Sequence, residues 1–300
     1  MQRGIKTGAV IVGWDNPSSY GVPAAPLDFA ICWSEIQKKE LVDGSDWDPE
    51  KVFVGGIPSY DGYFRKEWIM PREEYFKLHK LDPKRKLIGY ASSFVSFSPN
   101  YQNIEALAEL VAGDELAEPC QLLIRLHPNH FWEEPLYTAE REKISALAAR
   151  MPHVQVVEPV ALGGDLGRYS GEDMPEKTSM MAYSDVFTTV YSTMCVECAI
   201  HDRPITAVCI DAPGGWNKPG KFSLPLSKIG DWPTHQRFRK ASAGRVATDK
   251  EQLKAILNDY LRDPALDSAA RHKFIADEVT FSDGSSGRRV GEWLTKLTVG

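Results

Sequence analysis

The sequence alternates short apolar runs with stretches of helical periodicity, and this alternation limits the fold more than any other feature. Eight apolar runs are typical of strands: 8–14, 28–34, 51–57, 86–94, 120–128, 154–160, 185–192 and 204–210. Helical patterns separate most of these runs: 34–44, 101–113, 140–151, 176–184 and 192–202. Regular β–α alternation is typical of parallel sheets with helices on both faces. We therefore predict an α/β fold whose crossovers are right-handed.

A stretch with prolines at 58, 71 and 83 separates the first three strands from the other five. Three strands are few for a sheet domain of typical size. Either they join the larger sheet, or the N-terminal domain is incomplete in this chain. We predict a partial N-terminal domain at 1–70, a larger C-terminal domain at 71–275, and a closing helical segment at 276–300 that packs back toward the N-terminal part.

The chain changes character after residue 211. Residues 211–244 are rich in Gly, Pro and Trp and show little periodicity. We therefore expect a long ordered loop there. Loops of this length in compact domains are usually functional. Helices are expected at 249–263, with Asp249 as N-cap, and at 285–297.

The composition limits the class of protein. A formal charge of −6 argues against general nucleic-acid affinity but leaves room for a local basic pocket. No segment approaches the ~20 apolar residues of a membrane span, although peripheral membrane contact stays open. The five cysteines lie mostly in apolar runs, which predicts reduced, buried thiols and a cytoplasmic protein. Cys195 and Cys198 form a C-x-x-C without a second pair, so we expect helix packing there and no metal site.

The junction between a strand and the following helix at residues 191–193 is the first candidate site. The N-terminus of a helix leaves main-chain N–H groups unpaired and carries partial positive charge, so a phosphate fits there. Tyr191, Ser192 and Thr193 occupy this turn, and both hydroxyls can donate to an anion. Glu197 lies one turn into the helix, where it could accept from a sugar hydroxyl. The alternative is an ordinary Ser/Thr cap followed by a packing helix.

A second candidate lies at the end of the strand 120–128. Arg125, His127 and Asn129 follow the apolar run, and Pro128 prevents it from continuing as a central strand. A histidine at the carboxyl end of a parallel strand faces the crevice where such sheets bind ligands. His127 could therefore hydrogen-bond a phosphate, or it could be satisfied by nearby backbone. His130 is expected at the surface.

Further polar residues follow other strands. Ser92, Ser93 and Ser96 come after the strand at 86–94 and could line the same crevice, or belong to a serine-rich loop without contacts. Asp211 ends the strand at 204–210 and could orient a substrate hydroxyl.

A basic cluster falls in the loop predicted after residue 211. It could close over an anion or simply be a solvated face, and it comprises His235, Arg237, Arg239 and Lys240. The sequence contains no G-x-G-x-x-G, G-x-x-x-x-G-K-[ST], H-E-x-x-H or G-x-S-x-G motif. Dinucleotide redox, P-loop, zinc-protease and serine-esterase chemistries therefore lack their usual motifs.

Taken together, these segments resemble the GT-B glycosyltransferase superfamily. "LLIRLHPN" (122–129) is similar to the R-x-H-P segment of bacterial surface-carbohydrate transferases, including the CDP-glycerol glycerophosphotransferase type, and of the related UDP-N-acetylglucosamine 2-epimerases. Residues 183–208 resemble their segment with a Ser/Thr-rich turn, x-x-x-E-A and g-x-P-v-I. Residues 13–64 are similar to the last β-α-β portion of the family's N-terminal domain, and residues 247–294 to its closing helices.

The resemblance implies a Rossmann-like parallel sheet of GT-B type with a nucleotide-sugar or CDP-alcohol site in the C-terminal domain. It implies that His127, Ser192 and Thr193 contact the donor phosphates and that Glu197 contacts a donor hydroxyl. No metal is implied, because the helix N-terminus would stabilise the charge of the leaving group. Family members usually take their acceptor site and catalytic base from a full N-terminal domain. A partner chain that supplies the rest of that domain is therefore one interpretation.

Three functions follow from the resemblance. The leading hypothesis is a glycosyltransferase that moves a sugar or polyol phosphate from a nucleotide-activated donor to a carbohydrate acceptor in bacterial surface polysaccharide synthesis. The first alternative is a 2-epimerase-like enzyme acting on a nucleotide sugar. The second is a non-catalytic nucleotide-sugar-binding partner subunit. No catalytic residue is assigned.

Overall fold

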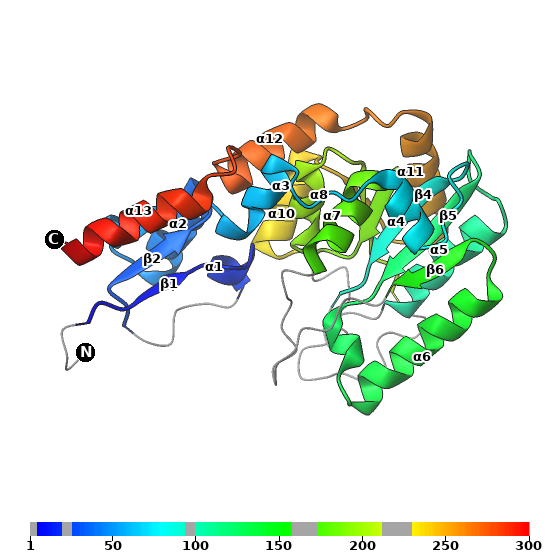
Figure 1. The fold of residues 1–300 in the computed structure, drawn as a ribbon, viewed down its shortest axis with the longest axis horizontal. Helices are drawn as coiled ribbons and strands as arrows, with labels where there is room; N and C mark the ends of the chain where they lie inside the picture. Colours follow the sequence, from blue (N-terminus) through cyan, green and yellow to red (C-terminus); the bar gives the residue numbers. More distant parts are fainter. Residues whose placement is uncertain (1–4, 20–25, 94–99, 158–172, 212–229, 300) are drawn as a thin grey trace.

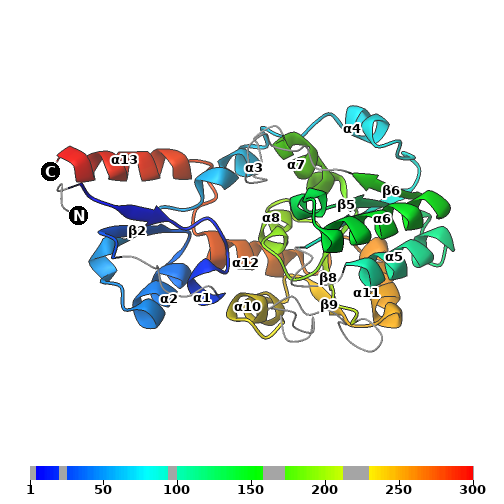
Figure 2. The same ribbon diagram turned by 90° about the horizontal axis from the view of Figure 1, so that it is seen from below.

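The strands form two parallel sheets, which lie side by side along the long axis of the molecule (Figures 1 and 2). A computed structural model describes residues 5–19, 26–93, 100–157, 173–211 and 230–299. The small sheet has the order β1-β2-β3 and the large sheet the order β6-β5-β4-β7-β8-β9. Every strand pairing among the described residues is parallel, which confirms the predicted α/β fold. The strands are β1 Gly8–Val10, β2 Phe29–Cys32, β3 Val52–Val54, β4 Lys86–Ala91, β5 Cys120–Arg125, β6 Val154–Val157, β7 Val186–Thr189, β8 Ile205–Val208 and β9 Arg245–Ala247.

Helices connect and cover these strands. The α-helices associated with the small sheet or lying between the two sheets are α1 Asn16–Ser19, α2 Glu35–Ser45, α3 Asp61–Arg65 and α13 Ser286–Val299. Helix α4 Arg72–Leu78 lies on the large-sheet side, where it contacts α7 (Figure 2). The large sheet carries α5 Tyr101–Ala112, α6 Pro135–Arg150, α7 Met174–Tyr183, α8 Met194–Ile200, α10 Pro233–Ala241, α11 Lys250–Arg262 and α12 Ser268–Val279. Short 3-10 turns are η1 Pro49–Lys51, η2 Pro58–Tyr60 and η3 Pro128–Phe131.

The order of strands in the large sheet creates a topological switch point. From β4 the chain moves outward through β5 and β6, and then returns to the other side of β4 with β7, β8 and β9. The crossovers on the two sides therefore run in opposite directions, and sheets of this kind usually bind ligands at the carboxyl ends of the strands where this reversal occurs, here β4 and β7. The last pairs in the ladder, Ala91 with Thr189 and Ala91 with Arg125, bring the turns after β4, β5 and β7 to the same edge.

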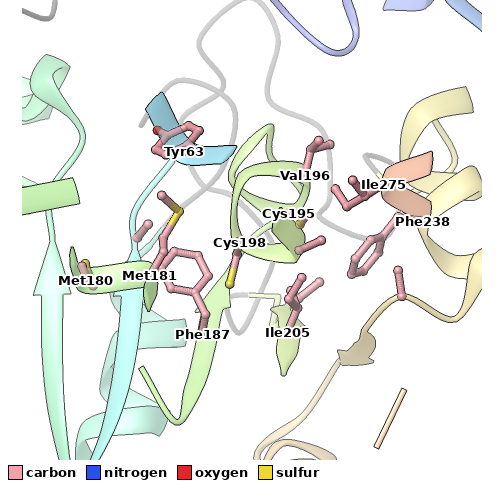
Figure 3. Packing of buried hydrophobic residues seen from close by; sticks show 14 of the residues in the cluster. Tyr63, Met180, Met181, Phe187, Cys195, Val196, Cys198, Ile205, Phe238 and Ile275 are labelled. Atoms are coloured by element: carbon pink, nitrogen blue, oxygen red, sulfur yellow. The ribbon is translucent and has the colours of Figure 1, made fainter. Parts of the chain in front are cut away.

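Two apolar layers cover the large sheet. On one face, buried residues of α5, α6 and α11 pack on the strands, among them Ile104, Ile144 and Leu253. The other face carries α7, α8 and α12, and Figure 3 shows Cys195 and Cys198 of α8 among apolar side chains such as Phe187 and Ile205. All five cysteines are free and buried, as predicted from their apolar surroundings.

The small sheet lies between α2 and the C-terminal helix α13 (Figure 2). On the α13 side, the ring of Trp293 stacks on Phe53 at 4.7 Å. The first turn of α13 is held by Asp61 of α3, whose two carboxylate oxygens accept from the main-chain N–H groups of Ser286 and Gly287, both at 2.8 Å. This carboxylate satisfies two of the N–H groups that a helix start leaves unpaired.

One apolar cluster joins the small-sheet side of the molecule to the large sheet. It contains Trp14, Trp33 and Tyr63 together with Phe187 and Phe274. The two sheets are thus bridged by packed aromatic side chains. The division at residues 70 and 275 stays a prediction.

Among the described residues, strand β1 is an edge strand of the small sheet, whose order is β1-β2-β3. Around it lie three exposed apolar side chains, Ile5 at 68%, Val10 at 45% and Val12 at 79%. The stretch from Gly8 to Gly13 carries no charge and no proline that would discourage pairing with another strand. Within the described residues, no helix has the length and apolar character that crossing a membrane requires.

The expectation of one long loop after residue 211 is wrong for its second part. Residues 233–241 form helix α10, and Arg245–Ala247 is the edge strand β9, whereas residues 212–229 lie outside the described ones. Pro233 stands at the first helical position, where its missing N–H costs nothing. The apolar face of this helix consists of His235 and Phe238, a spacing of three that is too short to stand out as a periodic pattern.

Candidate functional site

The turn between β7 and α8 is capped by one of its two predicted hydroxyl residues, as in the alternative interpretation of an ordinary Ser/Thr cap. Thr193 is the N-cap residue but makes no side-chain cap bond, and the Ser192 hydroxyl instead accepts from the Met194 main-chain N–H at 3.1 Å. Tyr191 is buried and stacks on His235, with ring centroids 4.7 Å apart. Ser192 and Thr193 stay half-buried. The tyrosine therefore packs beneath the turn, while the two hydroxyl residues reach toward its surface.

The turns after β4 and β5 are joined by direct hydrogen bonds. The main-chain N–H of Ser92 donates to Arg125 O at 2.9 Å, and the main-chain N–H of His127 donates to Ser92 Oγ at 2.7 Å. The Ser93 N–H donates to Asn100 Oδ1 at 2.9 Å. The structure thus brings Ser92, Ser93 and His127 together at the carboxyl edge, next to the turn that carries Ser192. Ser96 lies outside the described residues.

His127 occupies the middle of this edge. Its ring is half-buried, with Nδ1 at 2.8 Å from Asn129 Oδ1. Burial lowers the pKa of His127 to about 4, although the hydrogen bond with Asn129 opposes this shift. The imidazole is therefore neutral at pH 7.

Arg125 lies beneath the site and is paired with carboxylates. Its guanidinium, only 5% exposed, contacts Asp173 and Glu176. Glu176 also lies 3.2 Å from His79 Nε2. The charge of Arg125 is therefore compensated within the protein.

Glu197 is engaged within the protein. Its Oε2 accepts from the Tyr63 hydroxyl at 2.7 Å and lies 2.5 Å from Lys177 Nζ. All three side chains are buried or nearly so, and Tyr63 comes from the small-sheet side of the molecule. A donor hydroxyl that reached this carboxylate would have to share it with these two groups.

Asp211, another predicted candidate, lies apart from the switch point. It is exposed beyond the end of β8, where the Ile210 N–H donates to Asn103 and the Ile210 C=O accepts from Gln102. Strand β7 lies between β8 and β4, the strand that Ser92 follows.

The interpretation of the basic cluster as part of a loop over an anion is wrong for its described members, which lie on helix α10. His235 is buried between aromatic rings, stacked on both Tyr191 and Trp232. Arg237 is held in ion pairs with Glu40 and Glu278, because the helix turns this face toward α2 and α12.

His130 is also corrected, because it is fully buried and not at the surface. Its Nδ1 lies 3.1 Å from His127 O and its Nε2 lies 3.0 Å from Glu140 Oε2. The 3-10 turn η3 folds the chain back after Pro128 and buries this ring against α6. Among the described residues, no three His, Cys, Asp or Glu side chains gather in a way that could hold a metal ion.

Sequence reasoning missed Glu140 and Asn100, which hold these turns in place. Asn100 directly precedes a predicted helix, a position where asparagine is favoured as a cap. That signal could have drawn attention to Asn100. Glu140 sits within a helical pattern among other charged residues, and nothing in the sequence distinguishes it from its exposed neighbours.

The fold matches solved structures that include a UDP-GlcNAc 2-epimerase and a wall teichoic acid polymerase. The S. aureus MnaA–UDP structure superimposes with a TM-score of 0.60 at 13% identity, covering 99% of this chain and 70% of that one. UDP-GlcNAc 2-epimerase from Neisseria meningitidis bound to UDP-GlcNAc gives 0.57 at 13% identity, covering 90% and 62%. The wall teichoic acid polymerase TagF, as its H444N variant, gives 0.56 at 16% identity, covering 90% and 58%.

These matches confirm the expected resemblance at the level of the fold: the chain has a GT-B-like, Rossmann-type α/β architecture. No family model and no curated protein matches the sequence. The chain spans about three fifths of the length of TagF and of the Neisseria epimerase.

Proposed function

We propose that this chain binds a nucleotide-activated donor at the β4–β7 switch point and acts as a glycosyltransferase of GT-B type. The donor would be a UDP-sugar or a CDP-linked alcohol, and the transferred group a sugar or polyol phosphate in bacterial surface polysaccharide synthesis. The observation that carries this proposal is the convergence of Ser92, His127 and Ser192 on one edge of the sheet, with the first two joined by a 2.7 Å hydrogen bond.

The chemistry of this edge suits a diphosphate. Neutral donors, namely the Ser192 and Thr193 hydroxyls and the His127 imidazole, can hydrogen-bond phosphate oxygens without competing for a proton. As the donor bond breaks, negative charge grows on the leaving phosphate, where these preorganised donors would stabilise it.

The ligands bound in solved structures with this fold support the proposal. The MnaA structure contains UDP, the Neisseria epimerase contains UDP-GlcNAc, and one TagF structure was soaked with CDPG. The same fold therefore accommodates uridine- and cytidine-linked diphosphates in other proteins. Since epimerases stand among the matches, an epimerase-like activity on a nucleotide sugar is the second candidate.

Calorimetry and thermal shift with UDP-, CDP- and GDP-linked compounds test the proposal. We expect at least one to bind and to raise the melting temperature, because a ligand of the native state stabilises it. His127→Ala and the double variant Ser192→Ala/Thr193→Ala should each lose this binding while circular dichroism stays unchanged. Release of free nucleotide that requires a carbohydrate acceptor identifies a transferase, and interconversion of UDP-sugars without an acceptor identifies an epimerase. Binding without turnover would indicate a non-catalytic subunit, and no binding by any compound refutes the donor site.

Strand β1 is the place where we propose that further polypeptide completes the small sheet. Val10, the last residue of β1, and Val12 just beyond it are exposed apolar side chains that this polypeptide would cover. The part of TagF and of the epimerase without a counterpart here is large enough to supply such strands. Val12→Lys should abolish association with a partner chain and leave nucleotide binding intact, whereas Leu78→Lys, at an exposed site on α4, should change neither.

A further inference from the structure

A buried network of polar side chains connects the turns that carry Ser93 and His127. Asn100, fully buried, holds Ser93 from two sides: its Oδ1 accepts from the Ser93 N–H at 2.9 Å, and its Nδ2 donates to Ser93 O at 3.3 Å. The conformation of the turn after β4 therefore depends on where the Asn100 amide is held.

Glu140, on helix α6, holds both ends of this network. Its Oε1 accepts from the main-chain N–H of Asn100 at 2.8 Å and of Tyr101 at 3.3 Å. Its Oε2 lies 3.0 Å from His130 Nε2, and His130 Nδ1 lies 3.1 Å from His127 O. One carboxylate thus connects to the β4 turn through Asn100 and to the β5 turn through His130.

We propose that Glu140 is a positioning residue for the phosphate-binding edge, an inference that rests on the proposed donor site. It sets the separation between the Ser92–Ser93 turn and His127, so that donors from both turns can meet one diphosphate. Hydrogen bonds to a carboxylate are stronger than neutral ones, and this side chain is only 9% exposed, so solvent weakens them little. Neighbours of this kind commonly decide how well directly bound groups are oriented.

The variant Glu140→Gln keeps the size of the side chain and removes its charge. We expect the Kd for UDP, or for CDP where that is the tighter ligand, to rise about tenfold. The Kd for the matching nucleoside should not change, because the network touches only the turns that would face the phosphates. If Glu140→Gln acted only through a loss of packing, binding of the nucleotide and of the nucleoside would both weaken or both stay unchanged. Glu142→Gln, on the exposed side of the same helix, is the matched control and should bind like the wild type.

Amide hydrogen exchange gives a second readout that needs no ligand. In Glu140→Gln the amide of Ser93 should exchange about tenfold faster, because its acceptor Asn100 is no longer held. The variant His130→Gln breaks only the connection from Glu140 to the β5 turn. The amide of His127 should therefore exchange faster, while that of Ser93 stays protected. This variant also covers the case in which Glu140→Gln does not fold.

The two readouts separate failure of the inference from failure of the proposed function. If the wild type binds neither UDP nor CDP, the donor site is refuted, and the exchange of Ser93 and His127 alone decides whether Glu140 positions these turns. Unchanged exchange at Ser93 in Glu140→Gln overturns the positioning role. So does a Kd for the diphosphate within about twofold of wild type when the wild type binds it.

Discussion

The Tyr63 hydroxyl donates to the Glu197 carboxylate at 2.7 Å, linking the small-sheet side of the molecule to helix α8 of the large sheet. Lys177 Nζ lies 2.5 Å from the same oxygen. The carboxylate is 5% exposed, so both partners compensate a charge that would otherwise be costly to bury. The side chain expected from sequence to take a donor hydroxyl is therefore also part of the contact between the two sheets.

Removing this hydroxyl should destabilise the fold measurably. Tyr63→Phe deletes a buried hydrogen bond to a charged group, and we expect a loss of about 1–3 kcal/mol in the free energy of unfolding. Tyr101→Phe is the matched control, because the Tyr101 hydroxyl makes the same kind of bond to Glu105 at 2.9 Å on a far less buried helix face. Tyr101→Phe should lower the free energy of unfolding by less than about 0.5 kcal/mol. Urea unfolding measures both, and equal losses would show that Tyr63–Glu197 is no more important than a surface contact.

Arg237 provides a second link between the sheets. Its guanidinium donates to Glu278 at 2.6 Å and to Glu40 at 2.5 Å, and Trp14 Nε1 donates to Glu278 at 2.7 Å. Removing one partner of a buried ion pair leaves its carboxylates uncompensated. Arg237→Met should therefore lower the free energy of unfolding by about 2–4 kcal/mol. This is slightly below the loss for fully buried pairs, because the arginine side chain is 22% exposed.

Arg239→Met on the same helix is the control for this measurement. Arg239 pairs with Asp231 at 3.3 Å, but both side chains are largely exposed. Arg239→Met should lower the free energy of unfolding by less than about 1 kcal/mol. The Arg237 link would be contradicted by a free energy of unfolding that is the same in the two variants.

Three partly buried histidines should make the protein sensitive to acid. Burial lowers the pKa values of His79, His127 and His201 to about 4 in the folded protein. The unfolded chain has histidine pKa values near 6.5, so below that pH it binds more protons than the native state does. Stability is therefore full above pH 6.5 and falls as the pH drops toward 4.

Urea unfolding at pH 7 and pH 5 measures this dependence. We expect each histidine to contribute a loss on the order of 1 kcal/mol by pH 5. His201→Gln should flatten the slope between these two pH values, whereas His272→Gln, whose side chain is 68% exposed, should leave it as in the wild type. An identical slope in wild type and His201→Gln would show that burial of this ring does not suppress its protonation.

The sequence was sufficient for the parts of the fold that have strong periodicity. The alternation of apolar runs and helical patterns predicted the parallel strands and the helices α5, α6 and α11. These helices pack apolar side chains on the large sheet, whose central strands are buried. It also placed Ser92, His127 and Ser192 at carboxyl ends of strands. Helix α10 was missed because its apolar face consists of only a few residues, one of them a histidine.

Pairing between distant residues could not be inferred from the sequence. Arg125 and Glu197 were expected at a ligand, yet Asp173, Glu176, Tyr63 and Lys177 surround them. Those partners come from α3 and from the region of α7, and only the folded chain brings them together. His130 was expected at the surface because a polar residue after a turn usually is exposed, but η3 and α6 enclose it.

The neutral state of His127 gives the donor site itself a pH signature. With a pKa lowered to about 4, the imidazole contacts phosphate oxygens as a neutral donor throughout the neutral range. UDP-GlcNAc has no group that titrates between pH 6 and pH 8, so its Kd should stay constant within about twofold over this interval. A contact that required the imidazolium would instead weaken up to about tenfold for each pH unit above the pKa. Calorimetry at pH 6, 7 and 8 measures this, with CDP-glycerol as the probe if it binds more tightly, and His127→Ala should bind weakly at all three values. A Kd that rises steadily with pH in the wild type and not in His127→Ala would show that the histidine binds the donor in its charged form.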